Sequence, residues 1–453
     1  MPYVPHSDED VRRALAAIGV DDVDALFADV PGSILDPHLD LPPPMDEAAL
    51  LAHLDALAAR DQQRVPTFLG GGVRRHFIPA VTPRLAMQSE FVTAYTPYQA
   101  EVSQGVLQAT FEFQTMMSEL TGLPIANASM YDGASAVAEA ALLAVRQTRR
   151  ETVLVSRGVH PETREVLQTY LWPLGIAIEV ADLGADLTTP PPAVGDHVAA
   201  LIVQDPNHLG YLEAMPAMAE AAHAAGALLV AVVDPLSLAV LREPGSYGAD
   251  VAVGDGQVLG VPMQFGGPAF GFMVVTEPLL RQLPGRLVGQ TTDVDGRRAF
   301  VLTLQAREQH IRRSKAKSNI CSNHQLAALL ATVNMAALGP AGLREMAEGT
   351  VRRAHQLADA LLAAGADVPE NRRFFAEFVL RTRQDGATVR RRLAERGLRA
   401  GVPLPDEYGI GQGVILAATE LTTDDDIAAL SAALDDIAEL GARSSRTVAE
   451  VGA

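Results

Sequence analysis

Asp234 ends the apolar run ALLVAVVD, and a glycine-rich loop at residues 254–268 follows the next apolar run along the chain. A carboxylate at the end of a buried strand can keep the nitrogen of a pyridine ring protonated, and the ring then serves as an electron sink. A strand-end aspartate can instead cap the loop or helix that follows it. In one large class of α/β enzymes a loop of this shape carries the lysine that binds pyridoxal phosphate (PLP). The residues of this loop therefore help to decide between the two roles of Asp234.

The loop contains no lysine. Gln257 and Val258 stand where the lysine would be expected, and neither side chain can form an imine. Arginine could not replace the lysine either, because its guanidinium stays protonated and is a poor nucleophile. The whole sequence has two lysines, Lys315 and Lys317, in the basic run RRSKAKSN. Such a run is more typical of a solvated face or an interdomain ion pair. We therefore expect no catalytic residue in this chain.

Two further features belong with Asp234. The stretch YDGAS places Asp132, Gly133 and Ser135 at the start of a predicted helix, where free N–H groups and a hydroxyl suit a phosphate; a plain N-cap is the alternative. His160 follows a predicted strand and could stack on a flat cofactor, or it could be a capping or core histidine. Because ligands of open α/β sheets bind at the carboxyl ends of strands, we expect these residues to form a remnant cofactor site.

The elements that would position these residues alternate between strands and helices. Continuous Val, Ile and Leu runs separated by helical patterns predict a mostly parallel sheet covered on both faces. The predicted strands are residues 151–156, 176–181, 198–205, 227–234, 249–253, 269–275 and 374–381. The predicted helices are residues 7–18, 46–60, 106–122, 133–147, 161–170, 215–225 and 424–438.

These patterns predict three regions. Residues 1–65 form a helical and extended arm that contains the Pro-rich stretch DPHLDLPPP, residues 66–320 form the large domain, and residues 321–453 form linking helices and a small C-terminal α+β domain. The fold class is therefore α/β with a second, smaller domain.

Composition narrows the possible partners. The chain has 453 residues and a formal net charge of −19, which argues against nucleic acid or an anionic membrane as the main partner. No charge-free apolar run approaches the roughly 20 residues that span a bilayer. Cys321 is the only cysteine, so a reducing, cytoplasmic location is expected. We expect no metal site.

Long motifs resemble the P-protein family of the glycine cleavage system. They include YTPYQAEVSQGVLQATFEFQTMMSELTGLPIANASMYDGASAVAEA, QDPNHLGYLE, GADVAVGDGQVLGVPMQFGGPAFGF and REQHIRRSKAKSNIC, and the resemblance extends over nearly the whole chain. It implies a PLP-dependent transferase of fold type I, the aminotransferase-like class. Members occur as one long chain of two homologous halves or as two subunits. The GDGQ loop resembles the amino-terminal half, the α subunit, whereas the PLP-bearing half has an HK pair in that loop.

The resemblance implies a heteromeric glycine dehydrogenase (decarboxylating). PLP would be held by a β subunit (subunit 2), with none bound covalently to this chain. Glycine would be decarboxylated, and its aminomethyl group would pass to the lipoyl arm of H-protein. The implied assembly is an α2β2 heterotetramer.

Two segments could serve that partner. The first is a polar and aromatic cluster that would line the partner's pocket or the lipoyl channel; the alternative is a structural turn whose tyrosines pack at the subunit interface. Its members are Tyr95, Tyr98, Gln99, Glu101, Ser103 and Gln104. The second segment is FLGGGVRRHFIP, in which Arg74 or Arg75 could anchor a carboxylate or an acidic partner surface. The alternative there is a surface turn with solvated arginines.

Two other functions remain open from the residues. One is an autonomous PLP-dependent aminotransferase or decarboxylase, which requires a lysine that loop 254–268 lacks. The other is a non-catalytic regulatory protein on the same fold, which shares the missing lysine. Requirement for glycine-dependent CO2 release distinguishes it from an enzyme subunit.

Overall fold

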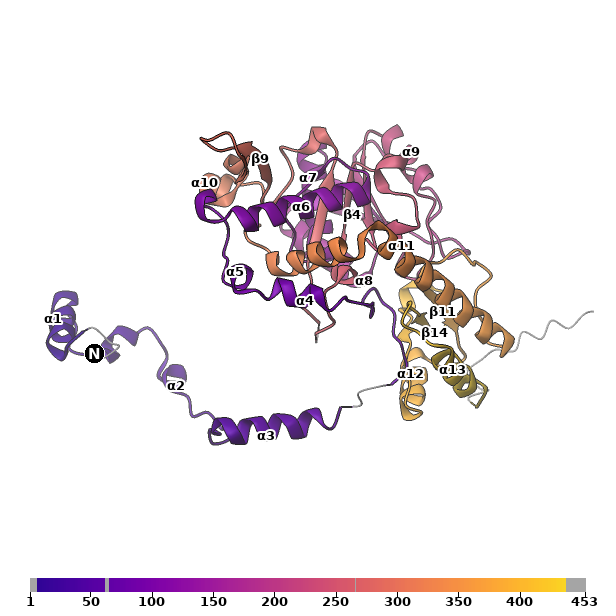
Figure 1. The fold of residues 1–453 in the computed structure, drawn as a ribbon, viewed down its shortest axis with the longest axis horizontal. Coiled ribbons are helices and arrows are strands. Elements are labelled where there is room, and N and C mark those ends of the chain that lie inside the picture. The colour runs from indigo at the N-terminus through magenta and orange to yellow at the C-terminus, as the bar shows by residue number, and fades with distance from the viewer. Residues whose placement is uncertain (1–5, 62–64, 265, 437–453) are drawn as a thin grey trace, which may run out of the picture. The chain divides into compact units, whose positions relative to one another are not determined.

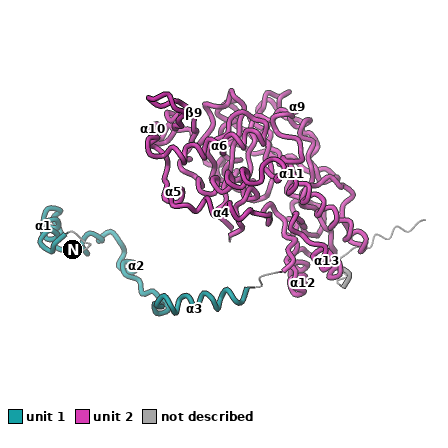
Figure 2. The backbone as a smooth tube through the Cα atoms, in the orientation of Figure 1, with its two compact units in different colours: residues 1–64 teal, residues 65–453 magenta. Residues whose placement is uncertain are grey.

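The computed structural model describes residues 6–61, 65–264 and 266–436, and the chain divides into two compact units at residue 64 (Figure 2). The predicted arm, the loop 254–268 and the C-terminal region each include residues outside this description. The first unit contains α1 (Asp8–Ile18), α2 (Gly32–Leu35) and α3 (Glu47–Ala58), and no residue of these helices is buried within it. Ser7 caps α1, and Gly19 ends it with a φ of 87°.

Figure 1 shows the second unit as a ribbon. It is organised by a sheet that has seven strands among the described residues, in the order β2-β8-β7-β6-β5-β3-β4. Neighbours from β7 to β4 are parallel, whereas β8 is antiparallel to β7 and β2 is antiparallel to β8. The predicted mostly parallel sheet is thereby confirmed. The strands are β2 (Ile125–Ala126), β3 (Thr152–Ser156), β4 (Ala177–Ala181), β5 (Val198–Asp205), β6 (Leu228–Val233), β7 (Val251–Asp255) and β8 (Gly271–Val275).

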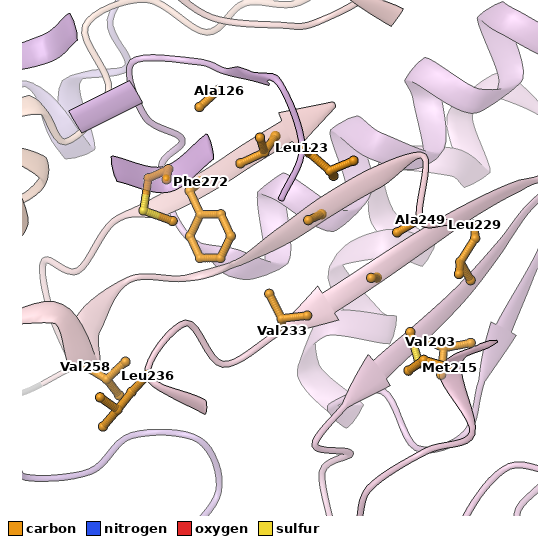
Figure 3. Close-up of a cluster of buried hydrophobic side chains, with 14 of the residues drawn as sticks. Leu123, Ala126, Val203, Met215, Leu229, Val233, Leu236, Ala249, Val258 and Phe272 are labelled. Atoms are coloured by element: carbon orange, nitrogen blue, oxygen red, sulfur yellow. The ribbon is translucent and has the colours of Figure 1, made fainter. Parts of the chain in front are cut away.

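Helices cover both faces of this sheet because successive strand residues point to opposite sides. Leu229, Ala231 and Val233 join the core cluster that also contains side chains of α6, α9 and α11. Val230 and Val232 join the opposite cluster, with α7 and α8. Figure 3 shows part of the first cluster. The helices are α6 (Gln104–Thr121), α7 (Gly133–Thr148), α8 (Pro161–Leu171), α9 (Met215–Ala224) and α11 (Gln325–Ala363).

Helix α11 leads from the large sheet to a small α+β domain. It bends at Gly339, which has a φ of 63° and precedes Pro340. By length and composition α11 could cross a membrane, contrary to the expectation from apolar run lengths, although 39% of its apolar stretch is buried within the fold. Core helices of soluble domains meet the same criterion. The small domain has the sheet β11-β14-β13. Its elements are β11 (Glu377–Arg381), α12 (Gly386–Glu395), β12 (Arg399–Ala400), β13 (Val402–Pro403), β14 (Gly413–Ala417) and α13 (Asp424–Asp436).

The sequence patterns located most of these elements within a few residues. The helix predicted at 424–438 is observed to Asp436, and its last two positions lie outside the described residues. The hairpin of β9 (Val288–Thr292) and β10 (Arg298–Leu302) was not predicted. β9 is mostly polar and exposed, so it has no apolar run. β10 has a short one, AFVL, with Phe300 and Leu302 buried, and the sequence patterns missed it. Other elements for which no range was predicted are β1 (Thr67–Phe68), α4 (Val81–Ala86), α5 (Ser89–Val92), α10 (Gln309–Arg312), α2, β2, α12, β12, β13 and β14.

The seven-stranded sheet and the three-stranded sheet of this unit meet beside Gly210. Its φ is 94°, and a Cβ built there would lie 2.0 Å from the backbone oxygen of Glu377. The neighbouring Tyr211 forms an antiparallel bridge with Phe374. Only glycine permits this approach, and the approach brings the start of β11 to the carboxyl edge of the large sheet.

Candidate functional site

The predicted cofactor-site residues converge on one cavity of about 410 Å³. Asp132 and Gly133 line it from the start of α7, His160 from the loop after β3, and Asp234 from the end of β6. Loop residues Asp255, Gln257 and Val258 line it after β7, and Glu377 lines it from β11. Ser135 does not line it. Its hydroxyl instead accepts a hydrogen bond from the Asp132 backbone N–H, at 3.2 Å.

Arg74 occupies the centre of the charged part of this cavity. Its guanidinium forms an ion pair with Asp234 and a second with Glu377, whose oxygen lies 2.5 Å from Nη1. Glu377 also accepts hydrogen bonds from the N–H groups of Gly71 (2.8 Å) and Gly72 (3.1 Å). The glycines thus let the loop wrap around the carboxylate.

The burial of Arg74 corrects one expectation. A surface turn with solvated arginines describes Arg75, which is exposed, but not Arg74, whose side chain is only 6% exposed. Burial alone would lower the pKa of Arg74, but the charges of Asp234 and Glu377 outweigh it and raise the pKa. Arg74 therefore does anchor carboxylates, and both belong to this chain.

The N-terminus of α7 is also occupied. Asp132 accepts a hydrogen bond from the N–H of Ser135 at 2.7 Å, so the capping alternative holds for this stretch. The N–H of Gly133 donates to the Asp255 carboxylate at 3.3 Å, and the N–H of Gln257 donates to the same carboxylate at 2.9 Å. Burial raises the pKa of Asp255, and these two backbone hydrogen bonds oppose the rise.

His160 caps α8 and also faces a second histidine. Its Nδ1 accepts from the N–H of Glu162 at 3.2 Å. Its ring meets the His208 ring edge-on, with centroids 4.4 Å apart. Burial, with the charges of His160 and Arg164, lowers the pKa of His208 to about 3, so His208 is neutral at physiological pH. The rings of His160 and His208 form this wall of the cavity.

Gln257 lies in the cavity where the lysine was expected. Its side-chain amide donates to the backbone oxygen of Val261 at 2.8 Å, and its side-chain oxygen accepts weakly from the N–H of Arg74 at 3.4 Å. Val258 is 5% exposed and belongs to the core cluster. Lys315 and Lys317 are not among the residues that line the cavity.

The residues of this cavity do not fit PLP. Asp234 would have to meet the ring nitrogen, but its carboxylate is paired with Arg74. Gly133 would have to meet the phosphate, but its N–H is directed at Asp255. No amine is present at position 257. No group of three or more His, Cys, Asp or Glu side chains suited to a metal ion occurs in the part of the chain that the structure describes.

A second depression lies on another surface, with a volume of about 590 Å³. Tyr95, Tyr98, Gln99 and Ser103 line it, so it unites four of the six residues of the predicted polar and aromatic cluster. Tyr95 is 75% exposed and Tyr98 is 43% exposed.

The other two cluster members lie beside this groove. Glu101 is exposed but is not among the lining residues. The Gln104 amide donates to the backbone oxygen of Phe300 at 2.8 Å and accepts from its N–H at 2.9 Å. Gln104 therefore holds β10 against α6.

The Tyr98 hydroxyl accepts a hydrogen bond from Arg286, a residue that the sequence patterns did not identify. Arg286 is 4% exposed and donates from Nη2 to the Tyr98 hydroxyl at 2.5 Å and to Cys321 Sγ at 3.2 Å. Burial raises the pKa of Tyr98, and so does its hydrogen bond with Cys321. Burial alone would raise the pKa of Cys321, but hydrogen bonds with Tyr98, Ser322 and Arg286 lower it.

Comparisons with known proteins show what this chain is similar to. A family model described as glycine cleavage system P-protein matches residues 1–434. Similar proteins include the probable glycine dehydrogenase (decarboxylating) subunit 1 of Moorella thermoacetica, which is 50% identical over 443 residues, covering 96% of this chain and 100% of that protein. The protein of the same name from Carboxydothermus hydrogenoformans is 47% identical, covering 94% of this chain and 98% of its own length.

Solved structures extend the comparison. The crystal structure of glycine decarboxylase (P-protein) of the glycine cleavage system, in inhibitor-bound form, has a TM-score of 0.86 and 55% identity, covering 96% of this chain and 100% of that one. The sphingosine-1-phosphate lyase of Burkholderia pseudomallei has a TM-score of 0.65 at 13% identity, covering 90% of this chain and 94% of its own, and shows the shared fold alone.

The ion pairs of Arg74 predict a large and local effect on stability. Replacing Arg74 with Met leaves two carboxylates without their buried partner, so we expect the free energy of unfolding to fall by about 3–5 kcal/mol. The matched control is Arg75→Met, one residue away and exposed, which should change it by about 0.5 kcal/mol or less. Urea unfolding measures both. Equal effects of the two substitutions would contradict the assigned geometry.

Proposed function

Because this chain belongs to the glycine cleavage system P-protein family, we propose that it acts as subunit 1 of glycine dehydrogenase (decarboxylating), paired with a subunit 2 that holds PLP. The observation that carries this proposal is the near full-length match to proteins named subunit 1, two of which are 50% and 47% identical to this chain. The reaction of the pair is decarboxylation of glycine, with transfer of the aminomethyl group to the lipoyl arm of H-protein.

The cofactor belongs to subunit 2 because this chain cannot provide its attachment. The electron sink that decarboxylation requires is supplied by PLP, and a Schiff base needs an amine. Gln257 provides none. The reacting groups therefore lie in subunit 2, and this chain completes the pocket around them.

This chain contributes the groove that Tyr95 and Tyr98 line. Tyrosine is enriched at interfaces because it combines a large apolar ring with a polar tip. Val102 beside them is 79% exposed. Neighbouring exposed apolar and aromatic side chains of this kind are typical of an interaction site. A partner pocket that closes over this groove would bury all three, and the polar residues Gln99 and Ser103 would then face the substrate or the lipoyl channel.

The remaining features of the assembly follow from the family and from composition. Docking of the lipoylated H-protein and an α2β2 arrangement are part of the proposal. A cytoplasmic location suits a chain with one cysteine and a net charge of −19.

The two rival functions are less well supported. An autonomous PLP enzyme would need an amine in the cavity, and the cavity has a glutamine instead. A regulatory protein would have the same cavity, and only a requirement for turnover separates it from an enzyme subunit.

Reconstitution tests the proposed function. Mixing this chain with the second subunit, PLP, glycine and lipoylated H-protein should release CO2, whereas omitting either chain should abolish release. Without subunit 2 the mixture lacks the amine that binds PLP, and without this chain it lacks part of the pocket wall. Full activity of subunit 2 without this chain would support the regulatory alternative and overturn the proposal. Full activity of this chain alone would overturn it as well.

Tyr98 is the most specific candidate within the groove. Tyr98→Phe removes the hydroxyl that Arg286 orients, and we expect glycine–CO2 exchange by the reconstituted pair to fall about tenfold, the scale of one charge-assisted hydrogen bond. The control is Tyr170→Phe, on α8 and not among the residues lining the groove. Unchanged exchange, with normal assembly of the pair by gel filtration, would remove Tyr98 from the proposed pocket.

A further inference from the structure

We infer that Arg74 and Asp255 are built-in substitutes for the two charged ends of PLP, so that this chain's own cavity rejects the cofactor independently of the missing lysine. The proposed function requires only that subunit 2 holds PLP, and it would survive if this inference failed. The inference concerns why the cavity of this chain does not bind PLP as well.

The ring end of the cavity is already neutralised. A pyridinium nitrogen needs an unpaired carboxylate, and Asp234 is the one that ends β6 at this place. Arg74 pairs with that carboxylate and at the same time with Glu377. A cofactor ring would have to take Asp234 from Arg74, and the buried guanidinium would then keep only one of its two carboxylate partners, Glu377.

The place where the phosphate would bind, at the start of α7, already has negatively charged carboxylates. A helix N-terminus binds phosphate through its free N–H groups, but here Asp255 accepts from Gly133 and Asp132 accepts from Ser135. Two carboxylates thus flank the start of α7. A phosphate dianion there would lose the N–H of Gly133 and meet like charge.

Lack of room does not explain the exclusion. The cavity volume of about 410 Å³ lies within the range of roughly 300–1,000 Å³ typical of small-molecule sites. The obstacle is therefore electrostatic, and it can be removed by substitutions that leave the backbone as it is. The two ends can also be freed separately, because no hydrogen bond or ion pair found in the structure joins Arg74 to Asp255 among the described residues.

The test measures binding of PLP and of pyridoxal, which lacks the phosphate, to the full-length chain by quenching of protein fluorescence. The first variant combines Arg74→Met with Glu377→Gln, which frees Asp234 without leaving Glu377 charged and unpaired. Its control adds Asp234→Asn, which removes the carboxylate itself. The second variant combines Asp255→Ala with Asp132→Ser, because serine retains an N-cap.

The two variants should respond differently to the two ligands. Freeing Asp234 should tighten both PLP and pyridoxal by at least roughly tenfold, and the Asp234→Asn control should lose that gain. Freeing the start of α7 should tighten PLP by a similar factor and leave pyridoxal unchanged. The wild-type chain should bind both weakly.

Supplying an amine gives an independent measurement. Gln257→Lys could condense with the PLP aldehyde and release water, and borohydride would then fix the cofactor for detection by mass spectrometry. We expect little attachment in Gln257→Lys alone and at least roughly tenfold more when it is combined with either variant. Far-ultraviolet circular dichroism identifies any variant that fails to fold. The variant at the other end of the cavity then tests the inference.

Three results would overturn the inference. They are wild-type binding of PLP as tight as that of the variants, no gain in PLP binding from either folded variant, and complete attachment of PLP to Gln257→Lys alone. CO2 release by the wild-type pair is measured in parallel, so that failure of the proposed function would be seen separately.

Discussion

The buried guanidinium of Arg74 is the interaction on which the organisation of the cavity depends. It joins Asp234, at the carboxyl edge of the large sheet, to Glu377, at the start of the small-domain strand β11. Without it, both carboxylates would lose their ion-pair partner. The close approach at Gly210 brings Glu377 into reach, and the flexible glycines at 70–72 let the loop carry Arg74 inward. In a cavity of PLP-enzyme type, two carboxylates are in this way paired with a guanidinium of the same chain.

A second consequence concerns the separation of scaffold and chemistry. The seven strands, the covering helices and the cavity at their carboxyl ends retain the architecture of a PLP enzyme, while Gln257 removes its covalent chemistry. The surface that we propose for a partner lies elsewhere, at the groove of Tyr95 and Tyr98. Selection for that surface would preserve the fold even after the cavity had lost its cofactor, because the groove is positioned by α6 and by the hairpin of β9 and β10.

The sequence predicted the fold well and the site only in part. Buried parallel strands have continuous apolar runs, so β5 was located to the residue, whereas β9 is polar and the apolar run of its hairpin partner β10 is short. The convergence of Asp132, His160 and Asp234 followed from the rule that strand ends share an edge. The burial of Arg74 did not, because an arginine pair after three glycines has the composition of a solvated turn. Glu377 and Arg286 lie far from their partners in sequence, so no local pattern could reveal them.

The central claim is that this chain has a PLP-enzyme fold but leaves the cofactor to its partner. Borohydride reduction of the active pair, followed by peptide mass spectrometry, tests it most directly. The account predicts phosphopyridoxyl label on a lysine of subunit 2 alone, with none on Lys315 or Lys317 of this chain. Stoichiometric label on either of those lysines would contradict it.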